Sequence, residues 1–267
     1  MQKKAVKTNA PRLLAEERRR VIVEMVEQSG QVTISEVAKN LAVSAVTARG
    51  DLDALAATGR VVRSHGGAVR RQEPTRDYPV DFKATLHRLE KMRIGEAAAG
   101  LVKSNETIIL DNGTTTAEIA RHLKTARLHN VTVITNALNI AMELANAPGL
   151  SLIMIGGLLR QISSSFVGPQ AEQMLRELHA HRLFLAVDGF DLEIGPSTPD
   201  VLEAQLNGLM MDVARETTIV ADSSKLGRRS LSKIGALERV SRLITDNRAP
   251  REFVAALRAR GIEVIEV

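Results

Sequence analysis

Apolar residues near the start of the chain follow the period of an α-helix. In residues 12–28 they recur three or four positions apart, which places them on one helix face, and Gly30 follows. Thr33 and Glu36 have the spacing of a capping box, in which each side chain satisfies a free backbone N–H. This pattern predicts one long helix and a second, short helix over residues 35–40.

A third helix is predicted from Ser44, a residue type that caps helix N-termini, to about Thr58. It follows a tight turn at residues 42–43. One face of this helix is apolar and comprises Ala48, Leu52 and Leu55. Two short helices joined by a tight turn after a longer helix are typical of a helix-turn-helix, whose second helix enters the major groove of DNA.

Residues 60–70 predict a small hairpin, because apolar positions flank Gly66 and Gly67. The segment is basic, and a basic hairpin beside a recognition helix is a winged helix-turn-helix, in which the wing binds phosphates. The candidate DNA-binding residues are Ser44, Ala45, Thr47, Arg49, Arg60, Arg63 and His65. A three-helix protein–protein module is the alternative, which the agreement of capping, spacing and charge disfavours.

From residue 94 on, short apolar runs rich in β-formers alternate with helical segments. The predicted strands are 107–110, 131–135, 152–155, 183–187, 218–221, 242–245 and 263–265. The predicted helices lie near 95–103, 115–124, 138–147, 170–179, 201–215 and 250–260. This alternation predicts an α/β fold class, with a parallel sheet covered by helices, after the N-terminal winged helix-turn-helix. Ligands of such sheets bind beyond the carboxyl ends of the strands.

The expected organisation is a DNA-binding domain over residues 12–70, a linker over 71–91 and an effector-binding and oligomerisation domain over 92–267. The linker is placed where Pro74, Pro79 and mixed charges interrupt the apolar period. Its second half, from residue 82 to 93, is compatible with a connecting helix.

Charge divides the chain in the same way. Residues 1–80 contain 14 Lys and Arg and nine Asp and Glu, whereas the remainder contains 22 of each sign. The net charge of +5 therefore resides in the first third, which favours a polyanion-binding head, with a solvated surface and basic tail as the alternative. Without a signal-peptide core or a membrane-length apolar run, we expect a cytoplasmic protein with no membrane partner.

The residue types present narrow the possible chemistry. The chain contains no cysteine, which excludes disulfides, a thiol nucleophile and Cys-ligated metals. The six histidines lack the spacing of metal ligands, so no metal site is expected.

The loop after the first strand of the second domain has the character of an anion site. Gly113 and three threonines, Thr114, Thr115 and Thr116, open a helix there. Free N–H groups and the positive end of the helix dipole attract anions. Because no lysine follows as in a P-loop, a single phosphate is a better candidate than a nucleotide, and a Thr-rich N-cap is the alternative.

Other strand ends also carry polar residues. Asn136 follows the second strand and Gly157 the third. Asp188 and Asp191 follow the fourth, and such carboxylates hydrogen-bond sugar hydroxyls or move protons. Lys225 follows the fifth and supplies a positive charge for a phosphate or an enediolate. Each alone is compatible with ordinary turn chemistry.

Residues 43–55 together with residues 63–68 resemble the N-terminal signature of the DeoR family of bacterial transcriptional regulators. The resemblance implies a repressor of sugar-catabolism operons. Gly50 departs from the signature, since the family usually has a second basic residue there. Glycine weakens a helix interior by about 1 kcal/mol relative to Ala and removes a contact to DNA.

The resemblance extends over residues 10–267 and implies an effector domain similar to ribose-5-phosphate isomerase. Asp188, Asp191, Glu203 and Lys225 match that enzyme's aspartates, its glutamate base and a second lysine, but residues 192–202 lack its further lysine. Asn207 also stands where many family members have lysine. The implied function is a sugar-phosphate pocket without catalysis. The implied effector-binding residues are Asp111, Gly113, Thr114, Thr115, Thr116, Asn136, Gly157, Asp188, Asp191, Glu203 and Lys225.

The sequence therefore predicts a repressor that binds operator DNA as a homodimer or homotetramer, with no catalytic residue and no cofactor. Residues 188–211 resemble the subgroup that regulates N-acetylgalactosamine and tagatose use, which implies a phosphorylated six-carbon sugar or amino sugar as effector. Two alternatives stay open: an active sugar-phosphate isomerase with a DNA-binding appendage, and an effector-independent DNA-binding regulator.

Overall fold

The computed structural model describes residues 14–29, 31–64, 66–70 and 77–267. The chain divides into two compact units, Met1–Glu73 and Pro74–Val267. Each unit has a hydrophobic core of its own.

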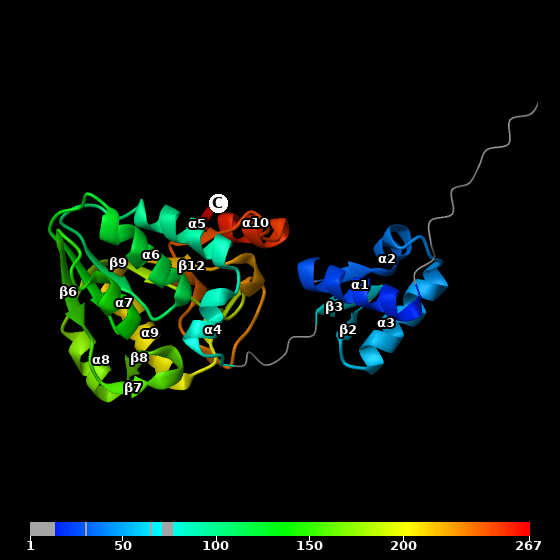
Figure 1. The fold of residues 1–267 in the computed structure, drawn as a ribbon, viewed down its shortest axis with the longest axis horizontal. Coiled ribbons are helices and arrows are strands. Elements are labelled where there is room, and N and C mark those ends of the chain that lie inside the picture. The colour runs from blue at the N-terminus through cyan, green and yellow to red at the C-terminus, as the bar shows by residue number, and fades with distance from the viewer. Residues whose placement is uncertain (1–13, 30, 65, 71–76) are drawn as a thin grey trace, which may run out of the picture. The chain divides into compact units, whose positions relative to one another are not determined.

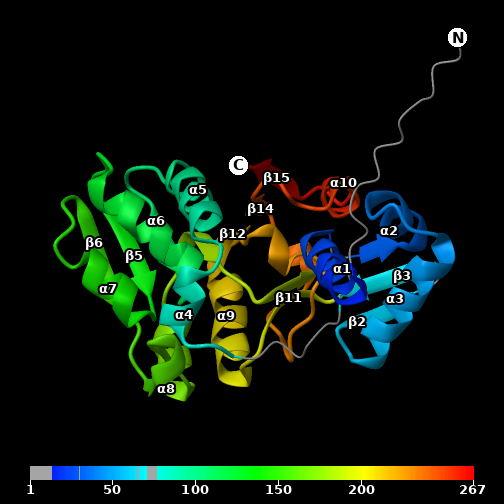
Figure 2. The ribbon, with the colours of Figure 1, turned by 45° about the vertical axis from the view of Figure 1, so that its right-hand side comes forward.

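Within its described residues, the first unit contains three helices and a small antiparallel sheet, which are drawn together in Figure 2. The helices are α1 (Ala15–Ser29), α2 (Ile34–Asn40) and α3 (Ala45–Ala57). The strands β1 (Gln31–Thr33), β2 (Val61–Ser64) and β3 (Gly67–Arg70) pair in the order β1-β3-β2. The helix-turn-helix and the hairpin expected from the sequence are therefore present. Strand β1 was not predicted, because three residues are too few to show the alternation of apolar and polar positions that marks a strand.

Local hydrogen bonds explain where these helices begin. The Thr33 hydroxyl accepts from the Glu36 N–H at 3.2 Å and the Glu36 carboxylate accepts from the Thr33 N–H at 2.7 Å, which is the expected capping box. The Ser44 hydroxyl accepts from the Thr47 N–H at 3.1 Å at the start of α3. Ala48, Leu52 and Leu55 are buried, as their shared helix face predicts.

Within residues 77–267, the second unit is built on a seven-stranded parallel sheet with the order β15-β14-β12-β9-β4-β5-β6. Figure 1 labels β6, β9 and β12 of this sheet. Its strands are β4 (Thr107–Leu110), β5 (Val131–Thr135), β6 (Leu150–Met154), β9 (Ala180–Leu185), β12 (Ala214–Val220), β14 (Arg242–Thr245) and β15 (Glu263–Glu266). The alternation of apolar runs and helices thus predicts the sheet correctly.

Helices cover both faces of this sheet. Its helices are α4 (Val80–Thr85), α5 (Arg88–Ala99), α6 (Thr114–Thr125), α7 (Leu138–Leu144), α8 (Pro169–Arg176), α9 (Val201–Val213) and α10 (Arg251–Ala259). Apolar residues of α5, α6 and α7 form one core with one face of the strands, and those of α8, α9 and α10 form another.

Short antiparallel elements lie outside the main sheet. The strands β10 (Gly189–Asp191), β11 (Gly195–Thr198) and β13 (Ser232–Lys233) form one small sheet, and β7 (Leu158–Arg160) and β8 (Ser165–Val167) form a hairpin. Three 3₁₀ turns accompany them at Gln161–Ser163, Ser223–Lys225 and Leu237–Arg239. These elements were not predicted, because β7, β8, β10 and β13 have only two or three residues and β11 contains Gly195 and Pro196 in place of an apolar run.

The structure differs from the sequence-based expectation at residues 74–91. The sequence assigns them to a linker, whereas the second unit begins at Pro74 and includes α4 and the start of α5. The apolar period is weak there because buried positions include the charged Lys91, and Asp77 and Lys83 make ion pairs.

The order of the strands places the candidate site. The chain runs from β4 outward through β5 to β6, and then returns to the other side of β4 with β9. The carboxyl ends of β4 and β9 therefore form a topological switch point, where open α/β sheets bind their ligands.

Candidate functional site

In the first unit, the predicted DNA-binding residues of α3 lie at its N-terminal end. Ala45 and Arg49 are exposed, Thr47 is half-buried, and Ser44 is the N-cap. A Cβ atom added to the exposed Gly50 would meet nothing within 4 Å, so the fold does not require glycine there. The arrangement presents the first turns of α3 to solvent, as a recognition helix requires.

The predicted DNA-binding residues of the hairpin differ in whether their side chains are exposed or already hold contacts within the protein. Arg60 is exposed. The Arg63 guanidinium, in contrast, lies 2.8 Å from the Asp53 carboxylate and donates to the Gly67 carbonyl. This arginine therefore braces the hairpin against α3, and His65 lies outside the described residues.

In the second unit, Asp111 directly follows β4 and is buried. Its carboxylate accepts hydrogen bonds from the Thr116 hydroxyl at 2.8 Å and the Gly113 N–H at 3.2 Å. Burial raises the pKa of Asp111 to about 7, although these hydrogen bonds oppose the shift. Asp111 thus shapes the loop that leads into α6.

Gly113 is the N-cap of α6 and has no side chain with which to cap it. A Cβ atom at this position would lie 2.1 Å from the Cβ of Ala186, which follows β9. The close approach of the β4 and β9 loops therefore requires glycine. Thr114 is half-buried, whereas Thr115 and Thr116 are buried at the start of the helix.

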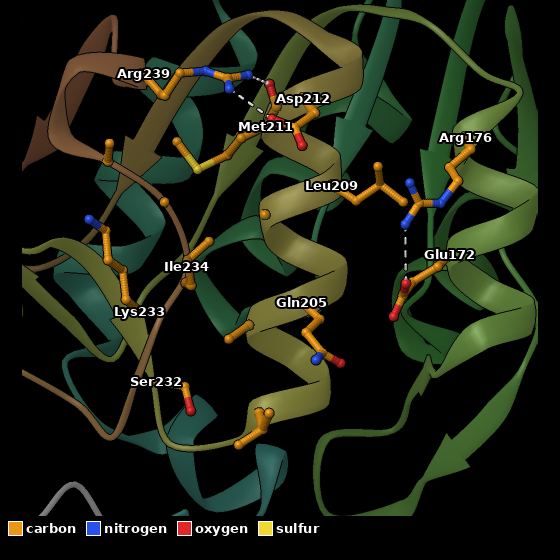
Figure 3. Close-up of a pocket in the computed structure, with 15 residues that line it drawn as sticks. Glu172, Arg176, Gln205, Leu209, Met211, Asp212, Ser232, Lys233, Ile234 and Arg239 are labelled. Carbon is orange, nitrogen blue, oxygen red and sulfur yellow. Dashed lines mark hydrogen bonds and ion pairs between the residues drawn. The ribbon is translucent and has the colours of Figure 1, made fainter.

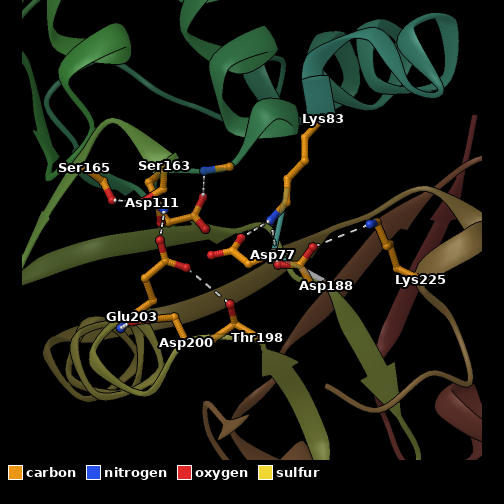
Figure 4. Close-up of polar contacts among 12 residues, drawn as sticks. Asp77, Lys83, Asp111, Ser163, Ser165, Asp188, Thr198, Asp200, Glu203 and Lys225 are labelled. Carbon is orange, nitrogen blue, oxygen red and sulfur yellow. Dashed lines mark hydrogen bonds and ion pairs between the residues drawn. The ribbon is translucent and has the colours of Figure 1, made fainter. Parts of the chain in front are cut away.

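Asp188, after β9, lies between two lysines (Figure 4). Its carboxylate oxygens are 3.1 Å from Lys83 Nζ and 3.6 Å from Lys225 Nζ. Burial alone would raise the pKa of Asp188, but the two ammonium groups outweigh it and lower the pKa. Burial would likewise lower the pKa of Lys83, but Asp188 and Asp77 reverse that effect and raise it. Asp188 and Lys83 are therefore charged at neutral pH.

A second set of polar contacts surrounds Glu203, which lies in the first turn of α9, and Arg160 makes two of its ion pairs there. Arg160 Nη1 is 3.2 Å from the Glu203 carboxylate, and Arg160 Nε is 3.2 Å from Asp200. The Asn112 amide donates to Glu203 at 2.8 Å, and the Thr198 hydroxyl donates to it at 3.3 Å. Glu203 is therefore fixed by groups from the loop after β4, from β7 and from β11.

Asp77 connects the two sets. Its carboxylate lies 3.4 Å from Lys83 Nζ (Figure 4) and also forms an ion pair with Arg160. Lys91 Nζ donates to the Lys83 carbonyl at 2.5 Å, and burial lowers the pKa of Lys91 to about 8. We define the polar cluster by its charged members, which are Asp77, Lys83, Arg160, Asp188, Asp200, Glu203 and Lys225.

The other predicted effector-binding residues make different contacts. Asp191 accepts from the Glu193 and Ile194 N–H groups and lies 3.0 Å from Arg229. Among the described residues, the ion pair of Asp191 is with Arg229 and with no member of the polar cluster. Asn136 donates to the Phe166 carbonyl at 2.9 Å, and its amide oxygen is buried without a partner in the described structure.

Gly157 has a positive φ of 147° and packs against β8, where a Cβ atom would meet the Val167 carbonyl at 2.7 Å. Its role in the structure is therefore a close backbone approach. No contact that we observe joins Gly157 to the polar cluster within residues 77–267.

Sequence reasoning missed Asp77, Lys83 and Arg160. Lys83 and Asp77 lie in the segment assigned to a linker, and Arg160 follows Gly157 by three positions, on a strand too short to predict. The Ser163–Ser165 loop was a weak signal for Arg160, because the Ser163 hydroxyl accepts from its guanidinium at 3.1 Å. Asn112 lies beside the predicted phosphate loop.

A separate groove of about 790 Å³ runs along α9 (Figure 3). Its lining includes Glu172, Arg176, Gln205, Met211 and Arg239. It shares none of its lining residues with the polar cluster. The chemistry of this groove is that of a surface with both charge signs and some apolar area.

Two further observations concern the described residues alone. None of their helices is both long and apolar enough for a membrane span. No three His, Asp or Glu side chains among them are placed to hold a metal ion.

Comparison with known proteins identifies both units. Residues 18–73 match the DeoR-like helix-turn-helix domain, and residues 86–247 match the DeoR C terminal sensor domain. A putative aga operon transcriptional repressor of Escherichia coli O157:H7 is 41% identical over 94% of this chain and 93% of that protein.

More distant relatives agree. The transcriptional repressor AccR of Agrobacterium fabrum is 34% identical over 87% of this chain and 90% of that protein. Among solved structures, ribose 5-phosphate isomerase A of Methanocaldococcus jannaschii aligns with a TM-score of 0.38 and 19% identity, over 51% of this chain and 53% of that chain. That structural similarity is too low to indicate chemistry, whereas the relatives over most of the chain are named as regulators, not as enzymes. The chain belongs to the DeoR family of transcriptional regulators.

Proposed function

We propose that this protein represses a carbohydrate-catabolism operon in the cytoplasm and that a phosphorylated sugar bound by the second unit relieves repression. The observation that best supports this proposal is the polar cluster at the switch point of the sheet, in a chain whose first unit is a winged helix-turn-helix. The names of relatives, which include a lactose phosphotransferase system repressor of Lactococcus lactis subsp. lactis, support a sugar operon.

In the second unit, different residues would bind the phosphate and the sugar of the effector. The phosphate would bind at the N-terminus of α6, where Gly113 leaves backbone N–H groups uncapped by any side chain. The sugar hydroxyls would donate to Asp188 and Glu203, and Lys225 would balance negative charge. This arrangement binds a sugar phosphate without needing to transform it.

The effector would be a phosphorylated six-carbon sugar or amino sugar. The name of the 41% identical relative, an aga operon repressor, supports this class. A homodimer or homotetramer would place paired heads on a symmetric operator. Effector binding would then shift the population away from the form that binds DNA.

The first experiment measures thermal unfolding with tagatose 6-phosphate, galactosamine 6-phosphate and N-acetylgalactosamine 6-phosphate, and with the unphosphorylated sugars as controls. A ligand at 100 times its Kd that binds only the folded state stabilises it by about 2.7 kcal/mol. We expect a higher melting temperature with one phosphorylated sugar and none with its unphosphorylated form. The same compound should release operator DNA.

A flat panel with folded protein contradicts the proposal and favours an effector-independent regulator. A coupled isomerase assay tests the enzymatic alternative, and we expect no turnover. Measurable turnover that Glu203→Gln abolishes would show an active isomerase instead.

A further inference from the structure

Asp77 is the link that joins the two halves of the polar cluster (Figure 4). Its carboxylate pairs with Lys83, which also holds Asp188, and with Arg160, which also holds Glu203 and Asp200. The side chains of Asp77, Lys83 and Arg160 are 17–23% exposed, so these ion pairs are only partly screened by water. Any ligand that bonds to Arg160 or Lys83 must share them with Asp77.

The charges of the cluster are unfavourable for a phosphorylated ligand while Asp77 is in place. Four carboxylates, those of Asp77, Asp188, Asp200 and Glu203, face three cations, those of Lys83, Arg160 and Lys225. A phosphate at the N-terminus of α6 would add negative charge beside this set, because Asn112, next to Gly113, donates to Glu203. Departure of one carboxylate would both remove repulsion and leave two cations for the oxygens of the ligand.

Three of the four carboxylates are fixed by the fold. Asp200 is the N-cap of α9 and accepts from the Glu203 N–H at 2.9 Å, and Glu203 also accepts from Asn112 and Thr198. Asp188 lies between β9 and β10, and its N–H donates to the Ser197 carbonyl at 3.1 Å. Asp77 lies before α4, outside any helix or strand. It is therefore the carboxylate that leaves at the smallest structural cost.

We propose that Asp77 is an internal competitor of the effector: the acceptor oxygens of a phosphorylated sugar replace its carboxylate on Arg160 and Lys83. This inference rests on the proposed function and adds a mechanism of coupling. Asp77 lies four positions after Glu73, the last residue of the DNA-binding unit. Its release frees the start of the second unit, to which the DNA-binding unit is joined.

The test compares Asp77→Asn with Asp81→Asn in the full-length protein. Both variants remove one negative charge from the same short segment, but Asp81 is exposed on α4 and makes none of the ion pairs of the cluster. Calorimetric titration measures the affinity for each phosphorylated sugar of the panel. If the form closed by Asp77 accounts for about 90% of molecules, Asp77→Asn lowers the apparent Kd by roughly tenfold, because apparent affinity scales with the competent fraction.

Each outcome is decisive. Tighter binding by Asp77→Asn and unchanged binding by Asp81→Asn support the proposal, as does binding that only Asp77→Asn shows. Equal or weaker binding by Asp77→Asn overturns the proposal and leaves the proposed function intact. If neither wild type nor Asp77→Asn binds any phosphorylated sugar, the proposed function fails and the competitor role fails with it.

A measurement on the wild-type protein covers the case in which Asp77→Asn does not fold. Amide hydrogen exchange over residues 80–86 is followed with and without the phosphorylated sugar that gives the largest melting shift. Faster exchange in this segment on binding supports release of Asp77. Unchanged or slower exchange overturns it.

Discussion

Asp111 and Asp188 are the same residue type at the ends of adjacent strands, yet their surroundings give them opposite properties. Asp111 has neutral hydrogen-bond donors, so burial dominates and its pKa rises to about 7. Asp188 lies between two ammonium groups, so its pKa falls below the ordinary value. Asp188 is thus an anion at neutral pH, as the proposed binding of sugar hydroxyls requires, whereas the Asp111 carboxyl holds the loop before α6.

The raised pKa of Asp111 has a consequence for stability. The folded-state pKa exceeds the unfolded value, so the stabilisation by protonation is complete below about pH 4 and is lost as pH rises to about 7. Relative to wild type, Asp111→Asn should therefore gain stability by roughly 1.4 kcal/mol per unit between pH 5 and 7. Urea unfolding at several pH values measures this, with Asp81→Asn as control. Parallel pH profiles for wild type and Asp111→Asn would contradict the assignment.

Arg49 is the exposed arginine in the first turns of α3. If it contacts a base, Arg49→Ala weakens operator binding by about 1–3 kcal/mol. Fluorescence anisotropy with operator DNA at fixed salt measures the change. Arg20→Ala is the matched control, because Arg20 is an exposed arginine of α1 whose observed partner is Glu24. An equal loss in both variants would show that Arg49 contributes only general charge.

At the scale of elements, a buried charge joins α1 to α3. Asp51 lies in the middle of α3, 2.8 Å from Arg18 Nε and 3.1 Å from Arg19 Nε. Asp51 is three positions after Ala48 and four before Leu55, so helical spacing places it on the apolar face of α3, where a lone charge would be unfavourable. Only the packing of α1 shows what neutralises it, because the two arginines lie more than 30 positions away.

Removing this carboxylate should loosen α3. Asp51→Ala leaves two arginines that regain water only in part, and we expect a loss of about 1–2 kcal/mol, less than for a fully buried pair. Hydrogen exchange of residues 45–57 measures the local opening free energy. Asp53→Ala on the same helix is the control, since its carboxylate is mostly exposed and pairs with Arg63. Equal protection in the two variants would exclude a role for Asp51 in joining the helices.

The difference between apolar and charged buried residues explains which helices and strands the sequence could predict. Strands β4, β5 and β14 have the predicted bounds, because they are apolar runs between polar turns. Helices α4 and the first turn of α5 were assigned to a linker, because their buried positions include Lys91 and their ion-paired residues look like solvent-exposed ones. Periodicity therefore finds elements whose buried face is apolar and misses elements packed through charges.

At the scale of the whole molecule, the topology of the sheet determines which strand ends meet. Residues at the ends of β4 and β9 come together at the switch point, so the sequence could predict that Asp111, Gly113 and Asp188 lie near one another, and their binding of an effector stays a prediction. Arg160 and Asp77 were not found, because they reach the site from a hairpin and from the segment before α4. Their approach depends on tertiary packing, which no local pattern encodes.

The division of the chain between Glu73 and Pro74 has a practical consequence for chimeras in which one member of the family supplies the DNA-binding unit and another supplies the second unit. A chimera joined at residue 92 would take Asp77 and Lys83 from the protein that donates the DNA-binding unit, and with them part of the cluster that we propose binds the sugar. A chimera joined before Pro74 keeps both residues with their native partners Arg160 and Asp188. Only a chimera joined before Pro74 should therefore combine the operator specificity of one parent protein with the effector specificity of the other.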